Sequence, residues 1–367
     1  MAGCVLYIQK HASLGGAEVN LVNLLRTHSP DCVRPMLCSG EEGFLTRRVR
    51  ELGLPVEVVR LPAWRKPAER LLNPLWLKRI VACHRSRGVS MVIANDFWYQ
   101  PYAFHVARRL RVPEVCIVQD SRATLRRARH HLLDKADGVV FVSEGIRRSL
   151  EGLFLTCPQA VIDNAVDPDR FSPEVSGEKV RDELGIGADD VTVGMVGSLS
   201  ELKSQHLLIE AASRIARQVP SVRFVFVGNG REQYLNRLRE TASLAGVDRR
   251  IVFAGLREDI PQVLAAIDVY AMLSAHEGQP LALLEAMANG KAIAYLPVPG
   301  VDEVVNAEVA LPIAERSPSA VADAVGGLCV DPGMRERLGI RARKRAEERY
   351  SLGRRVKRLE AFYEQFL

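Results

Sequence analysis

The chain has little that would place it in a membrane or among disulfide-stabilised proteins. Its 367 residues contain no apolar run of the roughly 18 residues that a membrane-spanning helix needs. The seven cysteines are scattered, odd in number and never spaced as Cys-x-x-Cys, which argues against a disulfide framework and a zinc site. The N-terminus also lacks the basic start and apolar centre of a signal peptide. We therefore expect a cytoplasmic protein.

Several binding motifs are absent as well. The eight histidines show no His-x-x-x-His spacing, and we expect no metal site. Asp167–Asp169 spells Asp-x-Asp, which some metal-dependent transferases use, but turn chemistry explains it fully. No Gly-x-Gly-x-x-Gly fingerprint supports a nicotinamide-dependent oxidoreductase. No zinc finger, RNA-binding signature or interleaved aromatic pattern points to nucleic acid as a partner.

The length of the chain favours two domains, and its 47% hydrophobic and 26% charged content is that of an ordinary globular protein.

The charge of the chain is unevenly distributed. Residues 1–150 hold 24 Lys and Arg against 13 Asp and Glu, whereas the remaining residues hold 26 against 31. Either the first half is a solvated basic face or it meets an anionic partner, for which a membrane fits better than nucleic acid. The inner face of a membrane is therefore a candidate location.

Short apolar runs alternate with helical patterns through both halves, which predicts parallel sheets covered by helices on both faces. The expected strands are Cys4–Gln9, Val33–Cys38, Val56–Leu61, Val89–Ala94, Glu114–Val118, Gly138–Val142 and Ala160–Ile162, then Val191–Val196, Arg223–Val227, Ile251–Ala254, Val269–Met272 and Ala292–Tyr295. The expected helices are Ala17–Thr27, Leu45–Leu52, Leu75–Arg87, Pro101–Leu110 and Glu144–Leu153, then Gln205–Gln218, Glu232–Ala245, Ile260–Ala266, Leu281–Ala288, Ser317–Gly327, Met334–Arg349 and Leu352–Phe366.

The alternation breaks into turn residues around Asn164–Pro173, where we place a domain boundary. The prediction is an α/β protein with a Rossmann-like doubly wound domain at 1–170 and a second at 171–351. Ligands of such sheets collect at the carboxyl ends of the strands.

The most informative stretch is the loop and helix around Glu277 and Glu285. Pro280 suits a first helical turn, and the apolar helix that follows should be buried. Glu285 is its only charge, and a buried carboxylate is unfavourable unless something donates hydrogen bonds to it. Glu277 lies before the helix, near its positive end. This arrangement is typical of a ligand site.

Three glycine-containing loops follow predicted strands. Gly15 and Gly16 precede a helix, which suits close approach to a phosphate, although a plain tight turn is the alternative. Gly197 and Ser198 lead to Lys203, which could meet a diphosphate or simply be solvated. Gly228 belongs to a Gly-x-Gly that is as readily an ordinary strand-to-helix turn.

These motifs together resemble the retaining GT-B glycosyltransferases of family 4, over nearly the whole length. The segments that carry the resemblance, in order, are Gly15–Glu18, Val161–Asp167, Gly197–Lys203, Glu277–Ala288 and Pro299–Val305. The resemblance implies a two-domain GT-B fold whose terminal helix, 352–367, crosses back to the first domain. It also implies a nucleotide-sugar donor held mainly by the second domain and an acceptor held mainly by the first.

The resemblance assigns roles to residues. Glu285 would bind the ribose hydroxyls, Glu277 would face the transferred sugar, and Lys203 would neutralise the diphosphate. The other expected donor-side positions are Gly15, Gly16, Gly197, Ser198, Gly228, Gly255, Leu256, Arg257, Gly278, Gln279 and Leu281. We expect a UDP-sugar rather than a GDP-sugar, no cofactor and no metal.

Two positions depart from the family pattern. Ser198 stands where the family usually has arginine, and Gln119 stands where it usually has histidine. Gln119 and Asp120 are nevertheless candidate catalytic positions, with Asn95 and Asp96 on the acceptor side. Arg122 and Arg126 belong to a basic cluster that could bind anionic lipid or an acidic acceptor, or could be a solvated face. The other members of this cluster are Arg127, Arg129, Arg147 and Arg148.

The leading hypothesis is a metal-independent retaining hexosyltransferase acting on a glycan or lipid-linked acceptor in cell-envelope polysaccharide synthesis. An inverting enzyme on the same scaffold, with Asp96 or Asp120 as general base, is the first alternative. A sugar-nucleotide-binding protein with little transfer activity is the second, motivated by Ser198 and Gln119.

Overall fold

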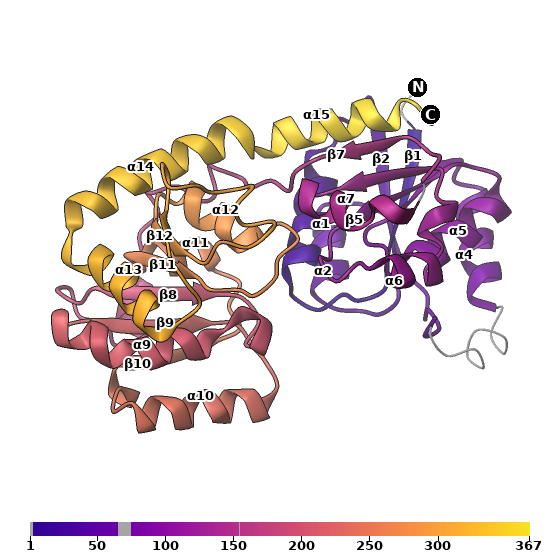
Figure 1. Ribbon diagram of the computed structural model, residues 1–367. Helices are drawn as coiled ribbons and strands as arrows, with labels where there is room; N and C mark the ends of the chain where they lie inside the picture. The colour runs from indigo at the N-terminus through magenta and orange to yellow at the C-terminus, as the bar shows by residue number, and fades with distance from the viewer. Residues whose placement is uncertain (1–2, 65–74, 154) are drawn as a thin grey trace. The chain divides into compact units, whose positions relative to one another are not determined.

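The computed structural model describes residues 3–64, 75–153 and 155–367. The chain forms two compact α/β units (Figure 1). The N-terminal unit contains the chain up to Asn164 together with Leu352–Leu367, and the C-terminal unit is Ala165–Ser351. The division falls in the turn-rich segment that follows the first series of strands, and the last helix belongs to the first unit.

The N-terminal unit is built on a parallel sheet with strand order β3-β2-β1-β4-β5-β6-β7. Its strands are β1 (Gly3–Gln9), β2 (Val33–Ser39), β3 (Val56–Val58), β4 (Val89–Ala94), β5 (Glu114–Val118), β6 (Gly138–Phe141) and β7 (Gln159–Val161). The order reverses between β1 and β4, so the loops that leave these two strands diverge. In doubly wound sheets this switch point is where ligands bind.

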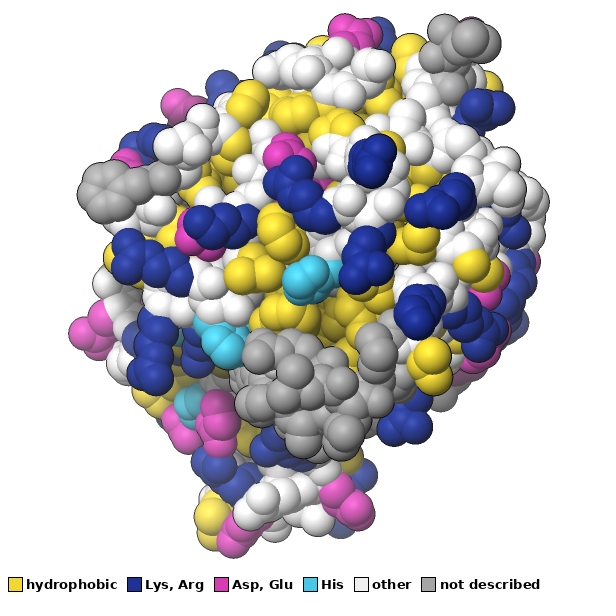
Figure 2. All heavy atoms as spheres, turned by 90° about the vertical axis from the view of Figure 1, so that its right-hand side faces the viewer, with side chains coloured by type: hydrophobic (Ala, Val, Ile, Leu, Met, Phe, Trp, Pro, Cys, Tyr) yellow, Lys and Arg dark blue, Asp and Glu magenta, His cyan; other side chains and the backbone are white. Residues whose placement is uncertain are grey.

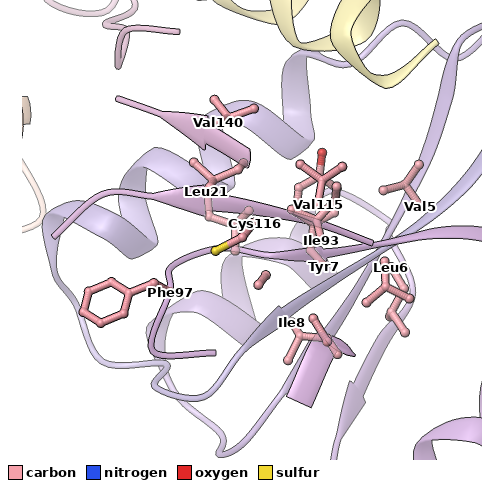
Figure 3. Packing of buried hydrophobic residues seen from close by; sticks show 14 of the residues in the cluster. Val5, Leu6, Tyr7, Ile8, Leu21, Ile93, Phe97, Val115, Cys116 and Val140 are labelled. Atoms are coloured by element: carbon pink, nitrogen blue, oxygen red, sulfur yellow. The ribbon is translucent and has the colours of Figure 1, made fainter. Parts of the chain in front are cut away.

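Helices cover both faces of this sheet and bury its central strands (Figure 3). They are α1 (Gly16–Thr27), α2 (Phe44–Glu51), α4 (Leu75–Arg85), α5 (Gln100–Leu110), α6 (Leu125–His130), α7 (Glu144–Ser149) and α15 (Leu352–Tyr363), with 3-10 turns η1 (Leu133–Lys135) and η2 (Glu151–Leu153). Val5–Ile8 of β1 are fully buried because the sheet is covered on both faces. Leu21 of α1 and Val115 of β5 belong to the same core.

The C-terminal unit repeats this plan with strand order β10-β9-β8-β11-β12-β13, again parallel throughout. Its strands are β8 (Thr192–Val196), β9 (Arg223–Val227), β10 (Ile251–Gly255), β11 (Val269–Met272), β12 (Ala292–Tyr295) and β13 (Leu311–Pro312). The order reverses between β8 and β11. The loops after these two strands carry Lys203 and Glu277.

The helices of the C-terminal unit are α8 (Glu178–Glu183), α9 (Gln205–Gln218), α10 (Glu232–Leu244), α11 (Ile260–Ala265), α12 (Leu281–Ala288), α13 (Pro318–Val330) and α14 (Pro332–Arg349), with 3-10 turns η3 (Glu201–Lys203) and η4 (Asp248–Arg250). As expected from its composition, α12 is buried along nearly its whole length. No helix within the described ranges is long and apolar enough to cross a membrane.

The two parallel sheets confirm the predicted fold class, and the differences from the expected elements are local. α6, α8 and β13 were not expected from the sequence. α6 and α8 each bury a single residue, Ala128 and Val180, so neither has an apolar period. β13 has two residues at a sheet edge, one of them Pro312, and leaves no strand pattern. The helix expected over 144–153 ends at Ser149 and continues as η2.

Candidate functional site

Lys203 and Glu277 meet at the carboxyl edge of the C-terminal sheet. Lys203 ends η3 after β8, and Glu277 lies in the loop between β11 and α12. The Lys203 Nζ is 2.5 Å from the Glu277 Oε1, and the two side chains are 28% and 10% exposed. Because β8 and β11 flank the point where strand order reverses, this ion pair lies where a ligand of the fold is expected. It offers a ligand one cation and one carboxylate.

The loops after β8 and β9 pack backbone against backbone beside this pair. Gly197 and Gly228 both have positive φ, of 148° and 136°. A Cβ on Gly228 would overlap the carbonyl oxygen of Gly197, and the Lys203 side chain passes over Gly197 with its Cε 3.7 Å from where a Cβ would stand. Gly228 therefore serves the contact between two loops, and Ser198, which follows Gly197, is exposed.

The segment from Glu277 to Leu281 is held from the other side by the Gly300 turn. A Cβ at Gly300, whose φ is 82°, would stand 2.5 Å from the carbonyl oxygens of both Glu277 and Gly278. Gly278, Gln279 and Leu281 are all buried, so this segment is closely packed. α12 then begins at Leu281, with Pro280 as its N-cap.

Glu285 is the isolated carboxylate that the sequence indicated. It lies on α12 with 7% of its surface exposed and accepts no hydrogen bond from any described residue. Burial raises its pKa to about 7, partly offset by the positive charge of Arg170. A buried carboxylate without donors is unstable by itself, so an incoming donor group would stabilise it strongly.

The loop after β10 is less available to a ligand than its sequence suggested. The Arg257 guanidinium donates to both oxygens of Asp259, at 2.8 and 2.5 Å, and to Glu183 at 2.9 Å. The hydrogen bonds that Arg257 donates to Asp259 raise the pKa of Arg257 further above its usual value. Leu256 is 57% exposed, and Gly255 accepts a backbone hydrogen bond from Gly228 at 2.8 Å. Arg257 is thus committed to two carboxylates.

In the N-terminal unit, the Gly15–Gly16 loop leads into α1 beside a carboxyl group. Gly15 is the extended N-cap, and a Cβ on it would stand 2.6 Å from the Glu18 Oε2. Gln9 Nε2 donates to Glu18 Oε1 at 2.8 Å. Burial raises the pKa of Glu18, although its hydrogen bonds favour the ionised form. Any anion at this helix end would therefore lie close to the Glu18 carboxyl.

Asp96 and Asp120 form a carboxyl pair with different surroundings. Burial and the neighbouring Asp120 raise the pKa of Asp96 to about 8. Burial alone would raise the pKa of Asp120, but hydrogen bonds from Arg122 and from Trp98 Nε1, the latter at 2.9 Å, hold it below its usual value. Asp120 is therefore the carboxylate and Asp96 the better proton acceptor of the two.

Gln119 lies at the centre of a buried polar network. Its Oε1 accepts from Asn20 at 3.0 Å, and its Nε2 donates to the carbonyl oxygen and Oδ1 of Asn95 at 2.5 and 3.1 Å. Asn95 donates in turn to Gln9 at 2.9 Å. Arg355 of α15 donates to Asn20 on the other side.

The sequence did not indicate Asn20, which ties α1 to Gln119, Asn164 and α15. The feature that could have pointed to Asn20 is that it is a polar residue at a buried position of α1. Glu18 is a second polar residue buried on the same helix. Both ends of the Gln119 amide are used by the protein itself. The Gln119 amide is therefore held in a fixed orientation beside Asn95.

The predicted basic cluster lies around α6 and α7 and is partly neutralised by neighbours. Arg122 pairs with Asp120 at 2.5 Å, and Arg147 and Arg148 pair with Glu144. Arg126 is exposed and makes no ion pair with the described residues. Figure 2 shows one face of this unit, with Lys and Arg side chains spread among apolar ones and fewer acidic groups between them.

The Asp167–Asp169 segment is a turn, as its sequence suggested. The Asp167 Oδ1 accepts the backbone N–H groups of Asp169 and Arg170, each at 3.2 Å. Within the described residues, no group of three or more His, Cys, Asp or Glu is arranged to hold a metal ion.

Two family profiles match the chain, one in each unit. Residues 13–164 match the Glycosyl transferase 4-like domain, and residues 176–345 match Glycosyl transferases group 1. The first segment contains the Gly15–Gly16 loop, and the second contains Lys203, Glu277 and Glu285.

Individual proteins show the same likeness. The D-inositol 3-phosphate glycosyltransferase of Corynebacterium urealyticum is 32% identical over 214 residues, which are 56% of this chain and only 50% of that protein. The 2-deoxystreptamine N-acetyl-D-glucosaminyltransferase of Streptomyces fradiae is 26% identical over 90% of this chain and 86% of that protein. The structure of Anabaena HepE in complex with UDP and glucose superposes with a TM-score of 0.86 at 22% identity, covering 98% of this chain and 99% of HepE.

Both units thus belong to the type of fold found in GT-B glycosyltransferases. The two profiles and this fold together support a glycosyltransferase of the GT-B type.

Proposed function

We propose that this chain is a retaining glycosyltransferase that moves a hexose-type unit from a nucleotide diphosphate sugar to a hydroxyl of a glycan or lipid-linked acceptor. The observation that carries the proposal is Glu285, a buried carboxylate without a hydrogen-bond donor among the described residues. It lies on α12, the helix that directly follows the loop carrying Glu277 of the Lys203–Glu277 pair.

We assign Glu285 to the ribose of the donor. Two vicinal hydroxyls supply the donors that this carboxylate lacks, and each charge-assisted hydrogen bond formed away from water is stronger than a neutral one. A UDP-sugar is the favoured donor, which the fold shared with a UDP-binding protein supports.

We assign Lys203 to the diphosphate and Glu277 to the transferred sugar. Their charges satisfy each other across 2.5 Å. A diphosphate offers Lys203 more negative charge than one carboxylate does, so binding moves the ammonium toward the ligand and frees Glu277 to accept from sugar hydroxyls. Lys203 then stabilises the charge that develops on the leaving diphosphate.

We assign the acceptor to the N-terminal unit, with Asn95 and Asp96 on its side. The departing phosphate takes the proton of the attacking hydroxyl, so no enzyme nucleophile and no metal ion are required. The basic residues on the face of this unit that Figure 2 shows favour an anionic, envelope-linked acceptor at the inner face of a membrane.

The test is product analysis with UDP- and GDP-sugars and a panel of lipid-linked acceptors, with NMR assignment of the anomeric linkage. We expect a retained anomer and undiminished activity in EDTA. An inverted linkage, or loss of activity that only a divalent cation restores, contradicts the corresponding part of the proposal.

An inverting reaction is the second candidate, and the carboxyl pair supports Asp96 as its base. With its pKa raised to about 8, Asp96 is the more basic of the two carboxyls, and it can take a proton only in the ionised fraction, which grows toward pH 8, whereas Asp120 is held ionised by Arg122 and Trp98. An inverted product whose rate is lost in Asp96→Asn and kept in Asp120→Asn would favour this candidate.

A further inference from the structure

Arg316 links the two loops that carry Lys203 and Glu277. It follows β13 and precedes α13, outside every motif that the sequence indicated. One guanidinium nitrogen donates to Ser204 Oγ at 2.8 Å, and another donates to the carbonyl oxygen of Ser274 at 2.7 Å. Ser204 follows Lys203 directly, and Ser274 lies three residues before Glu277.

The Ser204 end of this bridge is a strained position. Ser204 has φ 55° and ψ 38°, a left-handed conformation that is unfavourable for residues other than glycine. It is buried and joins η3 to α9, so its conformation sets the direction in which Lys203 leaves the turn. A side-chain hydrogen bond from Arg316 helps to hold the residue there.

At Ser274, Arg316 connects two loops that also contact each other directly through their backbones. The Ala275 N–H donates to the Leu202 carbonyl oxygen at 2.7 Å. This backbone bond and the two bonds of Arg316 tie residues 202–204 to residues 274–275. The Lys203–Glu277 ion pair is formed by the side chains that leave these tied segments.

Among the described residues, the charge of Arg316 has no carboxylate partner, and Arg316 remains exposed although partial burial lowers its pKa. Two neutral acceptors therefore hold the guanidinium. Its planar fork reaches the two acceptors from two separate nitrogens in fixed directions, whereas the donors of an ammonium group share a single nitrogen on a flexible stem.

We propose that Arg316 is a positioning residue for the diphosphate subsite, acting through Lys203. This inference rests on the proposed function, because it supposes that Lys203 meets the diphosphate. By fixing both loops before the donor arrives, Arg316 reduces the freedom that Lys203 loses on binding. Its contribution should appear for ligands that reach Lys203 and not for ligands that reach only Glu285.

The test compares UDP with UMP by calorimetry on the whole protein. In both Arg316→Met and Arg316→Lys we expect the affinity for UDP to fall about tenfold, which is the effect of losing one or two hydrogen bonds. The affinity for UMP should change less than about twofold. Equal losses for both ligands, no loss for UDP, or full affinity in Arg316→Lys would each overturn the bridging role.

Arg214→Met is the matched control. Arg214 also links two elements, donating to Ser319 and Asp323 of α13 from α9, but it touches neither loop. We expect it to leave both affinities unchanged, and a matching selective loss of UDP affinity in this control would overturn the assignment to Arg316.

A second measurement separates action through Lys203 from direct contact with the ligand. In a Lys203→Met background, Arg316→Met should weaken UDP binding no further. Additive losses would mean that Arg316 touches the diphosphate itself and would overturn the positioning role. If the wild-type protein binds neither UDP nor UMP, the proposed function fails, a result distinct from any of these.

Discussion

At the scale of single residues, Glu285 combines a proposed role in donor binding with an unfavourable contribution to stability. Its pKa is raised by burial from an ordinary 4.5 to about 7. Between these pH values the unfolded chain carries the charge and the folded chain holds a proton, so the stability contribution of this carboxyl falls as pH rises and stays low above pH 7. A carboxylate kept at such a position is typical of a binding site.

Glu285→Gln should therefore stabilise the protein and weaken donor binding. At pH 8 we expect a gain of about 1–3 kcal/mol in the free energy of unfolding, because the buried charge is removed. UDP affinity should fall at least about tenfold, since an amide cannot accept from both ribose hydroxyls as a carboxylate does. Urea denaturation and calorimetry at pH 8 measure the two effects.

The same substitution should remove a pH dependence. Wild-type UDP affinity should rise between pH 6 and pH 8 as Glu285 ionises, whereas Glu285→Gln should lack this part of the rise. Comparing the two proteins at each pH cancels the titration of the nucleotide. Identical pH profiles would mean that Glu285 does not contact the ligand.

Residue identities were easier to predict than residue partners. The sequence singled out Glu285 because it is the only charge in an apolar helix, and burial follows from that pattern. It could not show that Arg257 pairs with Asp259 and Glu183, or that Gln119 spends both ends of its amide on Asn20 and Asn95. Arg257 and Asp259 pair within one loop, whereas the partners Glu183, Asn20 and Asn95 come from other parts of the chain that the fold brings together.

At the scale of elements, the contact between the loops after β8 and β9 requires glycine at one side. Gly228→Ala should destabilise the protein by about 2–4 kcal/mol, because its φ of 136° is strained for alanine and the added Cβ overlaps the Gly197 carbonyl. Urea denaturation measures the loss.

Gly246→Ala is the control for backbone strain alone. Gly246 also has positive φ, of 67°, but a Cβ there meets nothing within 4 Å. Its loss should be only about 1 kcal/mol. Equal losses for the two substitutions would show that the contact between the loops adds nothing.

Asn20 is one of the residues that link α1 to α15, beside His28, which contacts Glu360 of α15. Asn20→Ala should destabilise the protein by about 2–4 kcal/mol, because it leaves Gln119, Asn164 and the buried Arg355 guanidinium without a shared partner. In the double variant with Arg355→Met, most of this loss should be recovered, since the uncompensated buried charge is gone. Additive losses in denaturation experiments would contradict the network.

Elements were predictable where an apolar period marks them. The strands and α12 are such cases, because burial on two faces requires long apolar runs. α6 begins at a Thr124 cap and buries one residue, α8 buries one residue, and β13 is a short strand at the edge of a sheet. None of these features produces a regular spacing of apolar residues in the sequence.

At the scale of the whole molecule, buried acids should make stability fall from pH 6 to pH 9. Burial raises the pKa of Asp96 and of Glu114 to about 8 in each case. Both hold a proton in the folded state where the unfolded chain has lost it, so each lowers the free energy of unfolding by up to about 1.4 kcal/mol per pH unit below pH 8. Thermal melting across this range measures the slope.

Glu114→Gln isolates one of these groups away from the proposed site. Glu114 is buried against Gln100, whose Nε2 donates to it at 2.5 Å. The variant should melt higher than wild type at pH 8 and show a shallower slope. Parallel melting curves for the two proteins across pH 6–9 would contradict the raised pKa.

The sequence by itself determined the two doubly wound units, the buried helix with its single carboxylate and the motifs shared with glycosyltransferases. These are local properties, since apolar period, turn residues and motif spacing are written along the chain. Only the tertiary structure decided which side chains meet. The Lys203–Glu277 pair, the Gln119 network and the Arg316 bridge join residues far apart in sequence, and the order of strands in each sheet brings them together.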